Sequence, residues 1–121
     1  MPTDQERPLP ELVDLTSLPG VVCPCGVARR AFGDREDFPG TVHLTGICQD
    51  AKTHYHRSHT EVYVILKCDD DAAIELDGQR HSIRPKMTVL IPPGVRHRAL
   101  GTMEVLILCL PKFDPEDEYF D

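Results

Sequence analysis

The chain has 121 residues, is 40% hydrophobic and carries a formal net charge of −7 at pH 7. This length supports one domain with a single modest core, and the hydrophobic content is typical of a globular chain and not of a disordered one. The acidic balance argues against a nucleic-acid backbone as the main partner. The longest apolar run, residues 105–110, is too short to span a membrane, and the polar first residues do not resemble a signal peptide, so we expect a cytoplasmic protein.

The pattern along the chain predicts many short strands and no amphipathic helix. Residues 1–20 contain four of the eleven prolines, which oppose helix interiors and central strands, and predict an irregular arm with at most a short strand or turn near residues 12–15. From residue 21 onward, β-prone runs alternate with turn residues. The predicted strands are residues 27–32, 41–48, 61–66, 72–76, 79–83, 87–91 and 104–110. This spacing indicates an all-β barrel or sandwich.

Two segments and the tail carry more specific information. Asp77 and Gly78 separate two predicted strands and supply the positive φ angles that a two-residue hairpin turn requires. Residues 104–110 are apolar on both faces, which predicts a strand that is buried on both sides or paired at a dimer interface. We expect the acidic tail to pack loosely or to extend over a partner subunit. The expected organisation is an irregular N-terminal arm (residues 1–20), a β-barrel domain (21–110) and an acidic C-terminal tail (111–121).

The cysteine content indicates reduced thiols. Five cysteines form an odd set without the spacing of a disulfide framework. Cys23 and Cys25 flank one proline and could bind a soft metal, but a tetrahedral thiolate site needs two further ligands, and the sequence offers none nearby. We interpret the pair as incidental thiols on an early strand or turn, and leave its role open.

Four potential metal ligands lie in two segments. His54 and His56 are two residues apart, and such residues on a strand point to the same face with Cα atoms about 7 Å apart. Glu61 follows after a short turn, and His97 follows a Pro-Pro-Gly turn at residues 92–94 that fixes a chain reversal just before it. Three imidazoles and one carboxylate suit a first-row divalent metal, and in an octahedral site they would leave two positions open.

These two segments resemble the two signature motifs of the cupin superfamily: His54-x-His56-x-x-x-x-Glu61 and Pro92-x-Gly94-x-x-His97. The resemblance covers roughly residues 40–110, and the chain looks like a small bacterial single-domain cupin of the cupin 2 conserved barrel type. It implies an all-β double-stranded β-helix, the jelly-roll or cupin barrel. It also implies that the three histidines and the glutamate hold a divalent metal ion, with iron, manganese, zinc and nickel all open.

The chain departs from the cupin pattern at turn positions. Lys86 stands where a glycine usually opens the second motif, and Cys48 and Cys68 stand where glycines usually flank the first. Gly101 replaces an asparagine that often follows. Lysine and cysteine adopt a positive φ angle less readily than glycine, so we expect these turns to be rearranged or slightly strained.

The expected chemistry depends on the metal. The resemblance implies dioxygenase chemistry with Fe(II), decarboxylation or oxidation with Mn(II), and isomerisation or hydrolysis with Zn(II) or Ni(II), and the fold does not choose among them. The leading hypothesis is a metal-dependent enzyme acting on a small oxygen-bearing metabolite, of dioxygenase, decarboxylase or sugar isomerase type. The alternative is a non-catalytic cupin that binds a small ligand or a metal. A purely structural barrel is disfavoured, because burying these ligands without a cation would be costly.

Further side chains are candidates for the pocket. Tyr63 shares strand parity with Glu61, so its phenol is predicted to reach the pocket or to fill the core. His59 lies at the predicted pocket mouth and is a candidate for proton transfer, although loop histidines are usually solvated. One of Arg29 and Arg30 must face inward and could bind a substrate carboxylate or phosphate, although a salt bridge at an interface is the more common role.

The remaining polar residues fit no motif. Arg96 and Arg98 flank His97 and are predicted to point away from the metal. His43 and His81 have no partner pattern, and His81 is expected to be exposed. No carboxylate other than that of Glu61 is well placed to act as a general base. The expected partners are a small-molecule substrate or ligand and a second copy in a homodimer, with no nucleic acid and no membrane.

Overall fold

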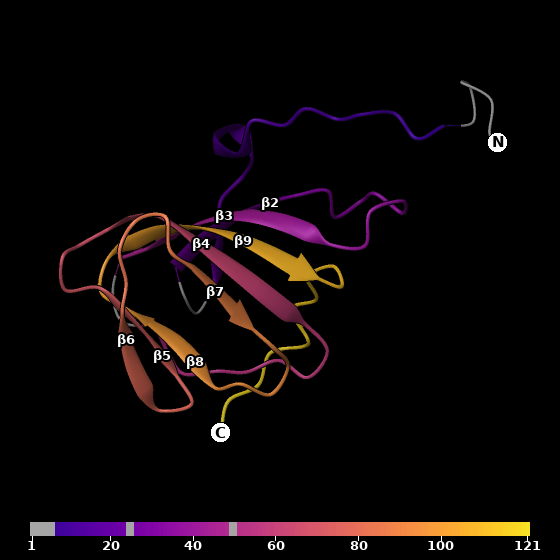
Figure 1. Ribbon diagram of the computed structural model, residues 1–121. Coiled ribbons are helices and arrows are strands. Elements are labelled where there is room, and N and C mark those ends of the chain that lie inside the picture. Colours follow the sequence, from indigo (N-terminus) through magenta and orange to yellow (C-terminus); the bar gives the residue numbers. More distant parts are fainter. Residues whose placement is uncertain (1–6, 24–25, 49–50) are drawn as a thin grey trace.

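Two antiparallel β-sheets pack face to face in the computed structural model, which describes residues 7–23, 26–48 and 51–121 (Figure 1). The larger sheet has the strand order β1-β2-β3-β9-β4-β7 and the smaller sheet the order β6-β5-β8. The strands are β1 (Val21–Cys23), β2 (Gly26–Ala31), β3 (Thr41–Ile47), β4 (Thr60–Cys68), β5 (Ala73–Leu76), β6 (Gln79–Ser82), β7 (Thr88–Ile91), β8 (His97–Leu100) and β9 (Met103–Leu110). This is the all-β jelly-roll barrel that the sequence predicted.

The core lies between the two sheets and follows from alternation along the strands. Inward-facing residues of β4 and β9 alternate with partly exposed ones, as the period of two requires. The core cluster consists of Ile47, Tyr63, Ile65, Ala72, Ile74, Ile83, Ile91, Ala99, Met103, Val105 and Ile107. No helix among the described residues is long and apolar enough to cross a membrane.

Strand β9 lies in the middle of the larger sheet, between β3 and β4. Val105 and Ile107 are buried on its inner face, whereas Leu106 and Leu108 on its outer face are only partly buried. Among the described residues, the outer face of β9 is therefore only partly buried, and its pairing at a dimer interface stays a prediction.

The local predictions differ in their outcome. The hairpin at Asp77 and Gly78 is confirmed: both have positive φ angles, 47° and 83°, and Leu76 pairs with Gln79. Of the short strand or turn expected near residues 12–15, the structure has a turn, the 3-10 element η1 (Leu15–Ser17), with Asp14 accepting a hydrogen bond from the Thr16 amide.

Strand β8 was not predicted, because its charged residues conceal an alternating pattern. His97 and Ala99 are buried, whereas Arg96 and Arg98 are partly exposed. The arginines lie on the outer side of the strand, and the strand continues directly from the turn that positions His97.

Lys86 shows the strain expected at one departure from the cupin pattern. Its φ angle is +76°, the left-handed conformation that glycine adopts without cost, and its amide donates to the Ile65 carbonyl at 2.8 Å. Cys48 and Cys68 do not have positive φ angles, so the strain is absent there.

The C-terminal tail is bound to the barrel of its own chain, so the expectation of loose packing is wrong. Tyr119 and Tyr55 exchange two backbone hydrogen bonds, of 3.0 and 2.9 Å. The Asp117 carboxylate accepts hydrogen bonds from the amides of Arg57, Ser58 and His59 at 2.9 to 3.0 Å. These contacts place the tail beside the segment that carries His54 and His56. In the N-terminal arm Leu9 and Leu12 are exposed, while Glu11 pairs with Arg35 at 3.4 Å.

Candidate metal centre

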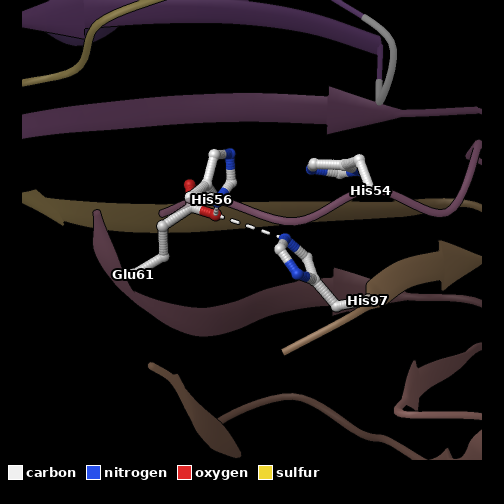
Figure 2. A group of neighbouring side chains, drawn as sticks. All are labelled: His54, His56, Glu61 and His97. Carbon is white, nitrogen blue, oxygen red and sulfur yellow. Dashed lines mark ion pairs between the residues drawn. The ribbon is translucent and has the colours of Figure 1, made fainter. Parts of the chain in front are cut away.

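The four predicted ligands converge inside the barrel. His54, His56, Glu61 and His97 are all buried, and one ligand atom from each lies within 4.8 Å of the others. Figure 2 shows the four side chains directed toward one another from separate stretches of the chain. Glu61 projects from β4 and His97 from the start of β8, while the two other histidines come from the irregular segment between β3 and β4.

Backbone pairing fixes the positions of the histidines. His54 and His97 form an isolated antiparallel bridge, with hydrogen bonds of 3.1 and 2.9 Å between their backbones. The turn before His97 uses Gly94 at φ +87°, and the Gly94 amide donates to the His56 carbonyl at 2.7 Å. A glycine suits this turn because an L side chain rarely adopts that angle. The two motifs are thus joined directly through main-chain atoms.

Two histidines are held in the tautomer that a metal requires. His54 Nδ1 lies 2.9 Å from the Lys52 carbonyl oxygen, and His97 Nδ1 lies 2.9 Å from the Val95 carbonyl oxygen. A carbonyl only accepts, so each Nδ1 carries the proton and donates it. The lone pair is therefore on Nε2, the atom left for a ligand bond.

Burial favours the neutral forms of His54 and His56. It lowers the pKa of His54 to about 4, with a further contribution from the nearby His97, and it also lowers the pKa of His56. For Glu61, burial alone would raise the pKa, but the facing imidazoles, first that of His97, lower it on balance. Neutral imidazoles with an ionised carboxylate are the protonation states that bind a metal ion.

The polar atoms at the centre fit a cation. Glu61 Oε1 lies 3.3 Å from both His56 Nδ1 and His97 Nε2, yet Glu61 Oε1 and His97 Nε2 are buried without a hydrogen-bond partner among the described residues. Orphaned buried polar atoms are costly. A divalent ion would satisfy both at once, and the set of three nitrogens and one oxygen suits first-row metals.

A small cavity of about 30 Å³ adjoins the centre. Its lining residues come from both ends of the chain, and most of them have polar side chains. The residues are Cys23, Ala28, Arg30, His43, Thr45, His54, His56, Glu61, Tyr63, Ile107, Phe113 and Glu118. The cavity therefore joins the metal ligands to a wall of side chains from β2, β3 and the tail.

Glu118 is the main residue that sequence reasoning missed. Its Oε1 lies 3.7 Å from His54 Nε2, and burial raises its pKa, with the charge of Glu61 acting in the same direction. The sequence indicated no carboxylate other than that of Glu61 in a position to act as a general base, whereas the structure places the Glu118 carboxylate beside His54. No local signal identifies Glu118, because the tail resembles a solvated acidic end until its docking is known.

His59 lies elsewhere than expected. It is 2% exposed and not at a solvated pocket mouth. Its Nε2 accepts a hydrogen bond from the Asp114 amide at 3.1 Å, and its Nδ1 lies 3.4 Å from Asp117 Oδ2. The ring centroid is 5.3 Å from that of His56. His59 thus binds the tail beside the centre, and a role in proton transfer stays a prediction.

Tyr63 lines the cavity as strand parity predicted, and its ring centroid lies 6.3 Å from that of His97. His43, which belonged to no motif, is buried in the same wall, with Nε2 2.7 Å from Thr41 Oγ1. Cys23 also lines the cavity, so it is not remote from the centre, while Cys25 lies outside the described residues.

The flanking arginines point away from the centre. Arg96 pairs with Asp121 at 2.9 Å, and Arg98 pairs with Glu75 at 3.2 Å. His81 is exposed on β6, as expected.

Fold and site together define a small β-barrel with a three-histidine, one-glutamate centre. Comparisons with protein-family models and with curated proteins found no match. Among solved structures, a protein from Planctomyces limnophilus is 43% identical with a TM-score of 0.89, over 93% of this chain and 97% of that one. Streptomyces PAC13 with uridine gives a TM-score of 0.75 at 13% identity, over 92% of this chain and 90% of that one. A cupin 2 conserved barrel domain protein from Salinispora arenicola gives 0.69 at 16% identity, over 85% of this chain and 90% of that one.

The chain belongs to one family with the Planctomyces limnophilus protein, and its likeness to the cupin 2 conserved barrel domain protein shows that it has the cupin fold.

Proposed function

We propose that this cupin is a metal-dependent enzyme acting on a small oxygen-bearing metabolite, of dioxygenase, decarboxylase or sugar isomerase type. One observation carries the proposal: a buried cluster of four ligand atoms, two of them orphaned, opens onto a cavity lined by further polar side chains. A bound divalent metal would supply Lewis acidity or redox chemistry at this point. Iron, manganese, zinc and nickel all suit the donor set.

The side chains around the cavity support chemistry on a bound molecule. His54, His56, Glu61 and His97 would hold the metal, with two ring orientations fixed by backbone carbonyls. The Glu118 carboxylate is close enough to accept a proton from a molecule bound next to His54. Phe113 and Glu118 of the tail line one side of this cavity.

The alternative is a non-catalytic cupin that binds a small ligand or a metal, and the small volume of the covered cavity favours it. PAC13 is a nucleoside dehydratase, but its likeness to this chain is one of fold alone and does not choose between the two.

Elemental analysis of untagged protein purified without added metal tests the proposal. We expect near-stoichiometric metal in the wild-type chain, and loss of most of it in His97→Ala with a β-type circular dichroism spectrum retained. His81→Ala, which changes an exposed histidine of β6, is the matched control and should keep its metal. Wild-type metal content in His97→Ala would show that the ligand assignment is wrong.

Turnover separates the two candidate functions. Iron or manganese would direct oxygen-consumption and decarboxylation assays with small chelating acids, and zinc or nickel would direct isomerase and hydrolase assays. A metal-loaded protein that binds such acids but converts none of them supports the alternative.

We also propose that the protein is a cytoplasmic homodimer. The support for the dimer is the row of aliphatic side chains on the outer face of the larger sheet, where Leu90 is 63% exposed and Leu66 is 40% exposed. A second copy would cover this face and its edge strand.

A further inference from the structure

We propose that Arg30 and Thr45 form a subsite for a carboxylate group in the cavity of the metal centre, and that the substrate class is therefore a small hydroxy or oxo acid. This inference rests on the proposed function, because it assigns the metal to one end of the ligand and the arginine to the other. Sequence alone could say only that either Arg29 or Arg30 faces inward.

The structure assigns the inward position to Arg30. Arg30 pairs with His43 on β3 and lines the cavity, whereas the Arg29 guanidinium donates to the Leu18 carbonyl on the outer side. The Arg30 guanidinium carbon lies 3.7 Å from the centroid of the Phe113 ring. Stacking on an aromatic face fixes the plane of a guanidinium and leaves its edge free to donate.

Arg30 has donor capacity that the protein does not use. Its Nε atom is buried and has no hydrogen-bond partner among the described residues. Leaving a buried N–H group of a charged guanidinium without an acceptor is costly. The missing acceptor therefore indicates that a ligand or a water molecule binds here.

Thr45 is a second, independent orphan in the same wall. It is completely buried, and its Oγ1 has no hydrogen-bond partner in the part of the chain that the structure describes. Thr45 lies two residues beyond His43, the cross-strand partner of Arg30, so it occupies the diagonal position on the same face. Diagonal neighbours in a sheet are roughly 7–8 Å apart, within reach of a long side chain. One ligand can therefore accept from both.

The chemistry of the wall favours a carboxylate. A guanidinium matches the planar, two-oxygen geometry of a carboxylate, and a hydroxyl donates a further bond. Glu61 and Glu118 line the same cavity, so a doubly charged phosphate would meet more repulsion than a singly charged acid. The volume of about 30 Å³ also restricts the ligand to a few heavy atoms.

The test compares glycolate, which has a hydroxyl and a carboxylate, with glycolamide, its neutral analogue, by calorimetric titration of the metal-loaded protein. Arg30→Gln should weaken glycolate binding roughly tenfold to a hundredfold, the loss expected for a charge-assisted hydrogen-bonded pair, and leave glycolamide within about twofold. Arg30→Lys should restore part of the glycolate affinity. Thr45→Val, which keeps the shape of the side chain, should weaken glycolate by about threefold to tenfold.

Arg29→Gln is the matched control, because it removes the same charge from the neighbouring residue on the outer side of β2. It should bind glycolate as the wild type does. Circular dichroism and metal content of every variant show whether it is folded and loaded, so a misfolded variant is not read as a loss of the subsite.

Two results would overturn the subsite. The first is unchanged glycolate affinity in folded, metal-loaded Arg30→Gln, which would leave only water at these donors. The second is inorganic phosphate binding as tightly as glycolate, which would refute the carboxylate class. A failure of the proposed function would give a different result, namely that elemental analysis finds no metal in the wild-type protein. In that case the same titrations on the metal-free protein still decide whether Arg30 binds the acid.

Discussion

Replacing Asp117 by alanine should release the C-terminal tail from the barrel. The Asp117 side chain is 9% exposed, and its carboxylate accepts three backbone hydrogen bonds from the loop after His56. Burial alone would raise the pKa of Asp117, but these three amides lower it below its usual value. A carboxyl group whose pKa is lower in the folded state stabilises the fold above its ordinary pKa of about 3.9. That stabilisation is lost as the pH falls through the lower folded value.

The magnitude follows from the three bonds. Each hydrogen bond contributes roughly 0.5–1.5 kcal/mol net, and water can replace the carboxylate in part because Arg57 and Ser58 are exposed. We expect Asp117→Ala to lower the free energy of docking of the tail by about 2–4 kcal/mol. Asp117→Asn retains one acceptor oxygen and should cost about half as much.

Hydrogen exchange of the Tyr119 and Tyr55 amides measures this docking directly, because these two amides bond the tail to the barrel. Exchange should be roughly 30- to 1000-fold faster in Asp117→Ala, the factor that corresponds to the expected loss of free energy. Asp121→Ala removes an exposed carboxylate that pairs with Arg96 and should change exchange by less than about fivefold. If Tyr119 in Asp117→Ala exchanges as slowly as in the wild type, the carboxylate does not hold the tail, and the reasoning fails.

Three further predictions concern stability and assembly. Burial first, and then the charge of Arg30, lower the pKa of His43 to about 4, so the unfolded chain takes up this proton at higher pH than the folded one. As the pH falls from about 6.5 to 4, the free energy of unfolding of the metal-free wild type should therefore decrease more steeply than that of His43→Gln, by about 1.4 kcal/mol per pH unit. If urea titrations give both proteins the same dependence of unfolding free energy on pH, this prediction is wrong. Lys86→Gly should stabilise the protein by up to about 1 kcal/mol, because glycine adopts the left-handed backbone conformation of this position without strain. Arg84→Gly, at a position without a positive φ angle, is the control and should destabilise the protein. A loss of stability in Lys86→Gly would argue against strain at this turn. Removal of residues 1–20 should shift the proposed dimer toward monomer or aggregate, and an unchanged dimer by light scattering would refute a role of the arm in assembly.

The sequence by itself determined most of the strands, the hairpin and the four central side chains. These features follow from local rules: a period of two along a strand, the positive φ angles of Asp77 and Gly78, and the two-residue spacing of His54 and His56. The strain at Lys86 was also predictable, because it depends on one residue in one turn.

The tertiary structure alone decided how the rest of the cavity is built. Glu118 and Phe113 line the cavity because the tail docks on the segment of Tyr55, and Arg30 and Thr45 share one face because β2 pairs with β3 in one particular register. Contacts between residues so far apart in the chain depend on strand order and on the docking of a tail that looks solvated when read alone. Local patterns specify which face a residue occupies, whereas the packing of the whole barrel specifies which other residues share that face.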